Sequence, residues 1–324
     1  MKNTELFLTA VNQEIEHIEY PVSPKELYDP IAYILALGGK RIRPLLTLMG
    51  ANIFSEYPLE SMPAAMAVEV FHNFTLLHDD VMDKADIRRG KPTVHKKWNE
   101  NAAILSGDAM LILAYQFLAK VDPLKLPQLL PLFSKTAVEV CEGQQFDMEF
   151  ESRMDVTVDE YMEMIRLKTA VLLGCALKLG ALHGGADLKD ADLLYEYGES
   201  IGLAFQLKDD LLDVYGDVAK FGKNIGGDIV SNKKTFLLIN ALQKADGELK
   251  RDLDAWIAKQ TFDREEKITA VRKIYDQLHL KALSEERMKY YYDKAIHSLD
   301  QMSVGADKTK DLRELAFQLM FRES

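Results

Sequence analysis

Residues 190–217, DADLLYEYGESIGLAFQLKDDLLDVYGD, repeat apolar residues three and four positions apart and show no alternation at period two. This spacing gathers the apolar side chains on one face of a helix and predicts helix rather than strand. Residues 161–182, YMEMIRLKTAVLLGCALKLGAL, have the same pattern. All ten prolines lie at or before Pro131, and good helix formers dominate the remaining chain. The sequence therefore predicts an all-α protein without convincing strands.

The predicted helix breaks are short and lie near residues 55–61, 122–127, 183–190 and 216–228. None has the composition of an interdomain linker, and the chain contains no tandem repeat. Length alone would allow two domains, but the even helical pattern favours one. We predict a single domain, residues 1–324, built as one large helical bundle.

Charge and composition narrow the class of partner. The net charge of −11 argues against nucleic acid, whereas basic residues that gather at 40–43, 88–97, 220–223 and 233–234 suit a small polyanion in a pocket. The first twenty residues lack the features of a signal peptide, which predicts a cytoplasmic protein.

We predict structural roles for the most apolar segment and for the two cysteines. Residues 102–119 are interrupted by Ser106, Gly107 and Asp108, which favours a buried helix over stable membrane insertion. Cys141 and Cys175 lack ligand spacing and are predicted to fill the core.

Two acidic clusters stand out within apolar helical segments. In DDVMD, Asp79 and Asp83 are four apart and share a helix face, with Asp80 on its flank. The same spacing returns in DDLLD, at Asp209, Asp210 and Asp213. Either cluster alone is compatible with a solvated acidic face, but two copies whose like charges repel indicate that a cation binds there.

Magnesium fits these clusters better than other metals. It prefers oxygen ligands and is usually held by one or two carboxylates together with substrate phosphate. A calcium loop would need alternating ligands around a glycine turn, and zinc would need His or Cys at ligand spacing. His78 adjoins the first cluster, but nothing comparable adjoins the second.

Basic residues beside the acidic clusters predict binding of a diphosphate. Arg88 and Arg89 closely follow Asp83, and a guanidinium can contact phosphate oxygens in bidentate fashion. The stretch ALGGKRIRPLL, residues 36–46, offers two glycines and three cations, although an exposed turn before a helix would look the same. Glycines and lysines also follow DDLLD, where Lys223 and Lys233 are candidates to close over an anion.

The chemistry that fits these residues needs no protein nucleophile. The chain has no nucleophile elbow, Walker loop or zinc-protease motif. Metal ions make diphosphate a leaving group by neutralising the charge that develops on it. An allylic substrate would then depart as a stabilised cation that an apolar cavity shields from water.

In its motifs the chain resembles the trans-isoprenyl diphosphate synthases of the polyprenyl synthetase family, short-chain type. The matching pieces run in the family's order over nearly the whole chain: GGKRIRP, FHNFTLLHDDVMDKADIRRGKPTVH, SGDAML, EGQQFD, RLKTA, FQLKDDLLDVYGD and GKNIGGDIVSNKKTF. The resemblance implies a homodimer of the isoprenoid synthase fold with a deep central cavity. It also implies condensation of isopentenyl diphosphate with an allylic diphosphate of C5 to C15.

The resemblance assigns roles residue by residue. The magnesium ligands, for about three ions per site as in the family, would be Asp79, Asp80, Asp83, Asp209, Asp210 and Asp213. The allylic diphosphate would contact Arg88, Lys168, Lys223 and Lys233, and isopentenyl diphosphate would contact Lys40, Arg43, His72 and Arg89. Thr169 and Gln206 would stabilise the carbocation, and Arg322 would approach the isopentenyl site. Without the resemblance, His72 would be taken for a core histidine.

Product length is predicted from the residues that precede Asp79. At about 1.5 Å per residue, Phe74 lies roughly 7 Å down the helix, where its ring would form a cavity floor backed by Phe71. In the family pattern an aromatic five positions before the motif suggests a short product, and Thr75 at the fourth position favours C20 over C15. Plain core packing of Phe74 is the alternative. Geranylgeranyl diphosphate is the expected product, with farnesyl diphosphate close behind.

Two other functions remain open from the sequence. A class I terpene cyclase also uses DDxxD and magnesium, but its second motif mixes Asn, Ser or Thr and Glu. A non-catalytic partner subunit would usually lose acidic motifs, and both are intact here.

Overall fold

Helices dominate the chain, as its sequence predicts. The computed structural model describes residues 2–216 and 225–321, and contact clustering divides the chain into two compact units. The first comprises Met1–Lys135, Cys175–Tyr195 and Met302–Asp311, and the second comprises Thr136–Gly174, Glu196–Gln301 and Leu312–Ser324. The prediction of one domain around a deep central cavity stays a prediction.

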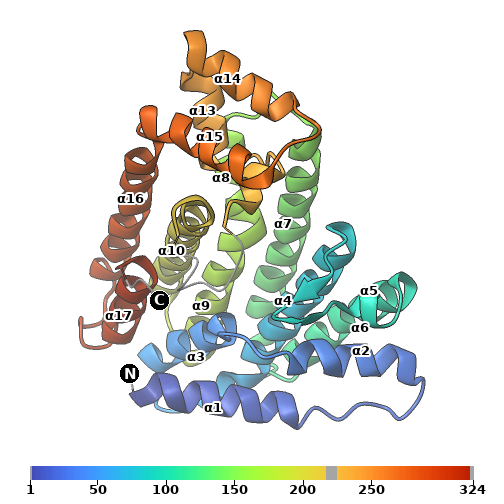
Figure 1. Ribbon diagram of the computed structural model, residues 1–324. Coiled ribbons are helices and arrows are strands. Elements are labelled where there is room, and N and C mark those ends of the chain that lie inside the picture. The colour runs from blue at the N-terminus through green and yellow to red at the C-terminus, as the bar shows by residue number, and fades with distance from the viewer. Residues whose placement is uncertain (1, 217–224, 322–324) are drawn as a thin grey trace. The chain divides into compact units, whose positions relative to one another are not determined.

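The first unit contains the N-terminal helices (Figure 1). They are α1 (Lys2–Glu16), α2 (Lys25–Ala36), α3 (Ile42–Phe54), the 3-10 helix η1 (Pro58–Ser61), α4 (Met62–Met82), α5 (Val94–Lys97) and α6 (Glu100–Leu118). Some helices contribute residues to both units: α7 (Leu126–Ser152), α9 (Val171–Gly184), α10 (Leu188–Tyr215) and α17 (Lys310–Phe321).

The second unit contains the remaining helices. They are α8 (Val158–Ile165), the π-helical turn η2 (Arg166–Ala170), α12 (Gly227–Val230), α13 (Phe236–Lys244), α14 (Gly247–Ala258), α15 (Arg264–Gln277), α16 (Leu280–Asp300) and most of α17 (Lys310–Phe321). The predicted breaks agree with the observed helix ends, since α3 ends at Phe54, α9 at Gly184 and α10 at Tyr215.

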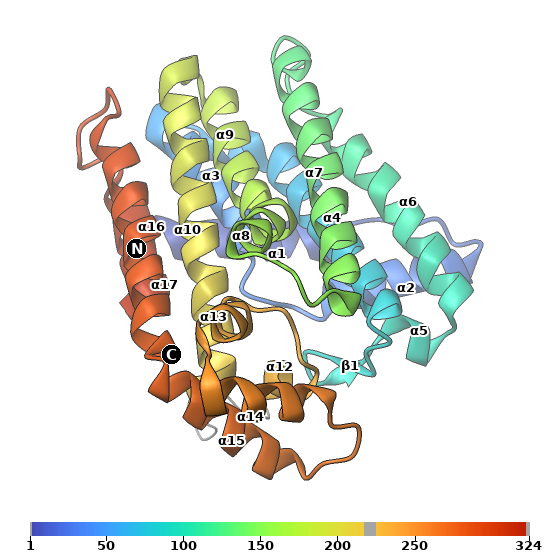
Figure 2. The ribbon, with the colours of Figure 1, turned by 90° about the horizontal axis from the view of Figure 1, so that it is seen from above.

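Helix α4 is deeply buried in the first unit. Every residue from Ala64 to Phe71 is buried, because α1, α2, α3 and α6 all contact α4. Helix α6 runs beside it, as Figures 1 and 2 both show. The apolar part of α4 therefore anchors the helix firmly, and its last turn carries the first acidic cluster.

Helix α6 is long and apolar enough to cross a membrane by length and composition alone, a test that buried core helices also pass. Its buried residues, among them Ala103, Met110 and Ala114, recur at helical spacing, and the helix packs on α4 and α2. Ile112 on another face is 61% exposed. One face of the segment is thus buried, as predicted.

The second unit has its own apolar core. Residues of α8, α10, α13, α14 and α15 form it, and Phe236 to Ala241 of α13 are all buried. A capping box at Thr157 and Glu160 starts α8, which continues directly into η2. This continuity places RLKTA in a π-helical turn, a distortion that is frequent at functional sites.

Two sequence predictions are wrong. Strands do occur: β1 (Ile87–Arg88) pairs antiparallel with β2 (Lys91–Pro92), and strands of two residues are too short for alternation to appear in the sequence. Cys175 is buried as predicted, but Cys141 is exposed. The apolar run around Cys141 identified a helix, yet it did not identify which face of α7 points outward.

Candidate active site

The first acidic cluster occupies the end of α4. Asp79 is partly buried, and Asp83 is exposed directly after the helix, where its main-chain N–H donates to the Asp79 carbonyl at 2.8 Å. One helical turn therefore separates the two carboxylates on the same face, as predicted. Asp80 differs, because it is only 2% exposed.

Asp80 forms an ion pair with Arg88, which the sequence reasoning did not foresee. Arg88 Nε donates to both carboxylate oxygens of Asp80 at 2.8 and 2.9 Å, and its Nη2 lies 2.7 Å from Oδ1. Arg88 ends β1, and Arg89 and Gly90 follow with φ of 52° and 73°. Positive φ at both central residues makes a two-residue hairpin turn, so the hairpin aims Arg88 back at the aspartate.

The predicted isopentenyl diphosphate residues form a cationic cluster in the same unit. Arg43 Nη1 lies 3.0 Å from His72 Nε2, and Arg89 Nη1 donates to the main-chain oxygen of Gly38. A Cβ at Gly39 would lie 2.8 Å from the Arg89 guanidinium carbon, and Gly39 has φ of 135°. The glycines of GGKRIRP therefore permit close approach of Arg89, and Lys40 beside them is exposed.

His72 is neutral in this cluster. Burial and the positive charges of Arg43, Arg89, Arg88 and Arg41 lower the pKa of His72 well below its ordinary value of 6.5. Since a guanidinium can only donate, Nε2 accepts from Arg43 and the ring proton sits on Nδ1. Burial also lowers the pKa of Arg43 to about 10, with Glu69 opposing this effect. The positive charge of the cluster therefore resides on its arginines and not on His72.

Acid should destabilise the protein partly through His72. A group whose folded pKa is lowered contributes stability above its unfolded pKa, and this contribution is lost as the pH falls below about 6.5. We expect His72→Gln to reduce the loss of unfolding free energy between pH 7.5 and 5.5, measured by urea denaturation. His17→Gln, at an exposed position, is the control and should behave like the wild type. Equal pH dependence in all three proteins would contradict the assignment.

The second acidic cluster lies near the end of α10. Asp209 is exposed, whereas Asp210 is 5% exposed. Asp213 Oδ2 accepts a hydrogen bond from the main-chain N–H of Asp228 at 2.9 Å, and the Asp213 carbonyl accepts from Gly226 at 2.6 Å. Asp213 therefore holds residues 226–228 against the acidic motif.

A chain of hydrogen bonds orients Asp210. The Tyr161 hydroxyl donates to Oδ2, and Gln206 Nε2 donates to Oδ1 at 3.2 Å. The Thr169 hydroxyl donates to Gln206 Oε1 at 3.3 Å. Burial raises the pKa of Asp210, and the hydrogen bond from Tyr161 acts against this. The structure thus brings together Thr169 and Gln206, the two residues to which the family resemblance assigns stabilisation of the carbocation.

Lys168 lies in the π-helical turn and pairs with Asp147 of α7. Its Nζ lies 2.5 Å from Asp147 Oδ2, and both side chains are about one-fifth exposed, at 24% and 20%. A Cβ at Gly143 would lie only 2.2 Å from the main-chain nitrogen of Lys168, so the glycine of EGQQFD lets the two backbones touch. Lys168 is therefore fixed in position by backbone packing as well as by charge.

These residues line a small cavity in the second unit. Its volume is about 80 Å³, and it is lined by Asp147, Tyr161, Met164, Ile165, Lys168, Thr169, Gln206, Asp210, Lys233 and Thr235. Lys233 also acts electrostatically on Asp210, since its charge lowers the pKa of that carboxyl. The lining of this cavity thus combines charged side chains with the apolar side chains of Met164 and Ile165.

Three residues of this region had no role in the sequence reasoning. Tyr161 precedes Lys168 by two helical turns, and a buried tyrosine needs a partner for its hydroxyl, which was the available signal. Asp147 stood in the quoted motif EGQQFD. Asp228 gave no periodic signal in the sequence. Burial raises the pKa of Asp228 to about 7. The charge of Lys233 lowers this pKa, whereas the carboxylates of Asp210 and Asp213 raise it further.

The predicted chain-length residues are packed on α4. The Phe74 ring contacts Phe71 at 5.5 Å and His78 at 4.8 Å between centroids, and Phe71 is 1% exposed. The Thr75 hydroxyl donates to the His72 carbonyl at 2.8 Å. His78 Nε2 donates to the Ile104 carbonyl of α6 at 3.0 Å, and this hydrogen bond links α4 to α6. Lys223 and Arg322 lie outside the described residues.

The donor sets suit magnesium. Each cluster offers carboxylate oxygens one helical turn apart, and magnesium takes one or two carboxylates together with phosphate and water. Within residues 2–216 and 225–321 no three His, Cys, Asp or Glu side chains already converge as a complete metal cage.

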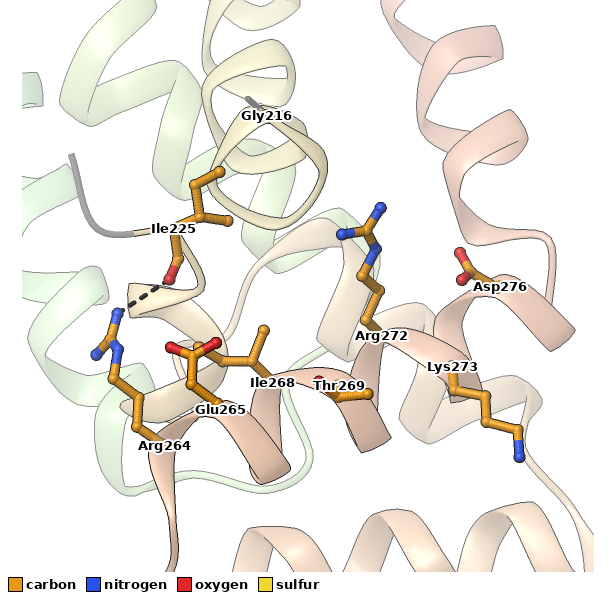
Figure 3. A pocket seen from close by; sticks show the side chains of 9 residues that line it. All are labelled: Gly216, Ile225, Arg264, Glu265, Ile268, Thr269, Arg272, Lys273 and Asp276. Atoms are coloured by element: carbon orange, nitrogen blue, oxygen red, sulfur yellow. Dashed lines mark hydrogen bonds between the residues drawn. The ribbon is translucent and has the colours of Figure 1, made fainter. Parts of the chain in front are cut away.

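A larger cavity of the second unit contains none of the predicted residues. It measures about 750 Å³ and lies along α15, where Arg264 Nη2 donates to the Ile225 carbonyl at 3.0 Å (Figure 3). Its charged lining is mixed, with Arg272 and Lys273 beside Glu265 and Asp276. Of its lining residues, Gly216 and Ile225 belong to quoted motifs, but the sequence assigned neither of them a role.

Comparisons with known proteins bear on the family and the activity of the chain. The family model for polyprenyl synthetase matches residues 24–277. The geranylgeranyl diphosphate synthase of Methanosarcina mazei is 44% identical over 236 residues, 72% of this chain and 73% of that protein. A solved structure of a geranylgeranyl pyrophosphate synthase is 46% identical, covers 99% of both chains and has a TM-score of 0.94.

Relatives with other products also match. The geranylfarnesyl diphosphate synthase of Natronomonas pharaonis is 37% identical over 250 residues, 71% of this chain and 73% of that protein. The comparisons therefore support the predicted isoprenoid synthase fold and prenyl transfer over the cyclase and non-catalytic alternatives, while product length stays open. The chain belongs to the polyprenyl synthetase family and is a short-chain isoprenyl diphosphate synthase, a trans-prenyltransferase of isoprenoid biosynthesis.

Proposed function

We propose that this enzyme joins isopentenyl diphosphate to allylic diphosphates of C5 to C15 and releases geranylgeranyl diphosphate, with farnesyl diphosphate as the alternative product. The observation that carries the proposal is the packing of Phe74 over the fully buried Phe71, one to two turns before Asp79. A ring supported from behind is a rigid floor for a growing prenyl chain. The relatives named geranylgeranyl diphosphate synthase support the same length.

In this proposal the aspartates of both motifs hold magnesium, about three ions as family resemblance suggests. Asp83 and Asp209 are exposed, Asp79 and Asp213 are partly buried, and Asp80 and Asp210 are bound to Arg88 and Tyr161. A carboxylate has about four lone-pair positions, so Asp80 can serve the arginine and an ion together. Magnesium held by these aspartates would neutralise the charge that builds on the departing diphosphate.

The remaining residues bind and stabilise the substrates. Arg88, Lys168 and Lys233, with Lys223, hold the allylic diphosphate, and Lys40, Arg43, His72 and Arg89 hold isopentenyl diphosphate. Neutral His72 donates a hydrogen bond from its Nδ1–H to the diphosphate. The arginines supply the positive charge that the diphosphate requires. The hydroxyl of Thr169 and the amide oxygen of Gln206 present oxygen dipoles to the carbocation.

Incubation with isopentenyl diphosphate and C5, C10 or C15 primers, followed by sizing of the products, tests the proposal. All three primers should be extended to C20, and nothing should form without isopentenyl diphosphate. Accumulation of C25 or longer chains would contradict the C20 assignment. A cyclised hydrocarbon made from the allylic substrate alone would contradict prenyl transfer itself.

Phe74→Ala should lengthen the main product by at least one C5 unit, because the cavity loses its floor. The substitution should also cost about 3–5 kcal/mol of stability, as loss of a buried phenyl ring usually does. Product sizing by mass spectrometry measures the shift. Phe7→Ala removes another buried ring of the first unit and should lose stability without lengthening the product. Unchanged length in Phe74→Ala would leave the ring a core residue only.

We also propose that the enzyme is a cytoplasmic homodimer. The support is the family resemblance together with Ile104, Leu105 and Ile112, apolar side chains of α6 that are 44–61% exposed and supply surface for a partner. Sedimentation at micromolar concentration should give twice the chain mass. A monomer would contradict the dimer.

A further inference from the structure

The middle cation of the basic turn faces inward. Lys40 is exposed, whereas Arg41 between Lys40 and Arg43 is only 6% exposed. Its backbone is left-handed, with φ of 48°, a conformation that residues with side chains rarely adopt. An arginine that is both buried and backbone-strained requires strong compensating contacts.

Arg41 ties three segments together. Its Nη1 donates to Glu69 Oε1 of α4 at 2.5 Å, and its Nη2 donates to the Leu35 carbonyl near the end of α2 at 2.6 Å. Glu69 is 2% exposed, and Asn73 Nδ2 donates to the same Oε1 at 2.8 Å. A buried ion pair with additional hydrogen bonds fixes the relative position of its segments, because breaking it would leave an unpaired charge.

On its other side, the turn that contains Gly38 and Arg41 borders a cavity. A cavity of about 380 Å³ between α1 and α2 is bordered by Tyr20, Leu35, Gly38 and Arg41. Side chains therefore do not fill the space behind Gly38 and Arg41. The turn depends for its position on the hydrogen bonds of Arg41, and on the contact between Arg89 and the Gly38 carbonyl.

The Arg41–Glu69 ion pair lies next to residues that the proposed function assigns to isopentenyl diphosphate. His72 follows Glu69 by three positions on α4, so the two side chains lie on neighbouring parts of one helix face. Arg43 follows Arg41 by two positions and contacts His72 at 3.0 Å. A shift of the Arg41 side chain would therefore move Lys40 and Arg43 relative to His72.

We propose that Arg41 is a positioning residue for isopentenyl diphosphate. Its buried pair with Glu69 locks the turn 38–43 so that Lys40 and Arg43 face the same diphosphate as His72, while Arg41 itself does not touch the substrate. This inference rests on the proposed function, which assigns isopentenyl diphosphate to this cluster.

Steady-state kinetics of two variants test the inference. In Arg41→Met the KM for isopentenyl diphosphate should rise about tenfold, the loss expected for a displaced cationic contact, and the KM for the allylic diphosphate should stay within about twofold. Arg41→Met/Glu69→Leu removes both charges, so its thermal stability should recover toward the wild type. Its KM for isopentenyl diphosphate should nevertheless remain raised. Arg153→Met, which breaks exposed ion pairs with Asp155 and Glu160, should change neither KM.

Two kinetic outcomes would overturn the inference. One is a double variant with wild-type KM for isopentenyl diphosphate, which would make the pair purely structural. The other is an equal rise of both KM values in Arg41→Met. Amide exchange without substrate adds a readout that does not depend on turnover: residues 38–43 should exchange faster in Arg41→Met, and unchanged exchange would also contradict the lock. Wild-type protein that incorporates no isopentenyl unit would refute the proposed function instead, and the exchange result would still decide the role of Arg41 in the turn.

Discussion

Asp79→Asn should lower kcat/KM for prenyl transfer about 10³-fold, because it would weaken binding of the magnesium that stabilises the departing diphosphate, and loss of one such stabilising group typically costs about 10²–10³. Asp79 is partly buried at the end of a helix that is packed on several sides. The amide keeps the shape of the side chain and removes its charge, so the helix should remain folded. The magnesium concentration needed for half-maximal activity should rise as well.

Controls separate this effect from general damage. Asp254→Asn removes a carboxylate from an exposed pair with Lys250 on α14 and should leave activity within about twofold. Asp79→Asn/Asp209→Asn should be little worse than either single variant, since groups that act as a unit are not additive. Wild-type activity in Asp79→Asn would show that the first cluster is only a polar surface.

Lys168→Met should lower kcat/KM for the allylic substrate between about 10- and 100-fold, because hydrogen bonds to charged groups contribute roughly 1.5–3 kcal/mol. Lys168 is held by Asp147 and by the backbone contact at Gly143, so its ammonium is already in place before substrate binds. The KM for isopentenyl diphosphate should stay within about twofold. Kinetics with each substrate varied in turn measure the two effects.

Lys250→Met, which removes the exposed partner of Asp254, is the matched control and should change neither constant. Lys168→Arg should recover part of the activity, since it keeps the charge but alters the donor geometry. A rise confined to the KM for isopentenyl diphosphate would mean that Lys168 serves the other substrate.

Periodicity predicted the helices well because their apolar faces are set by local spacing. The segment 190–217 became α10, ending at Tyr215, and the predicted breaks fall where the helices stop. The resemblance also placed Thr169 near Gln206, 37 positions apart, and the two side chains are hydrogen-bonded. Spacing within a helix was sufficient to put Asp79 and Asp83 on one face.

Contacts between distant segments were harder to predict. Nothing in the spacing of Asp80 and Arg88 revealed that a hairpin of two-residue strands would turn the arginine back onto the aspartate. The inward orientation of Arg41 depends on Glu69, which is 28 positions away. The sequence alone predicts that all cations of such a run are exposed. Burial of Tyr161 against Asp210 likewise depends on how α8 and α10 pack.

A crystal structure with magnesium, isopentenyl diphosphate and an unreactive allylic thiolodiphosphate tests the central claim most directly. The proposal predicts that carboxylates of both motifs, Asp79 and Asp209 among them, coordinate ions bound to one allylic diphosphate, with isopentenyl diphosphate on Arg43 and His72. Metal ions bound by only one motif, or an allylic diphosphate remote from both, would contradict it.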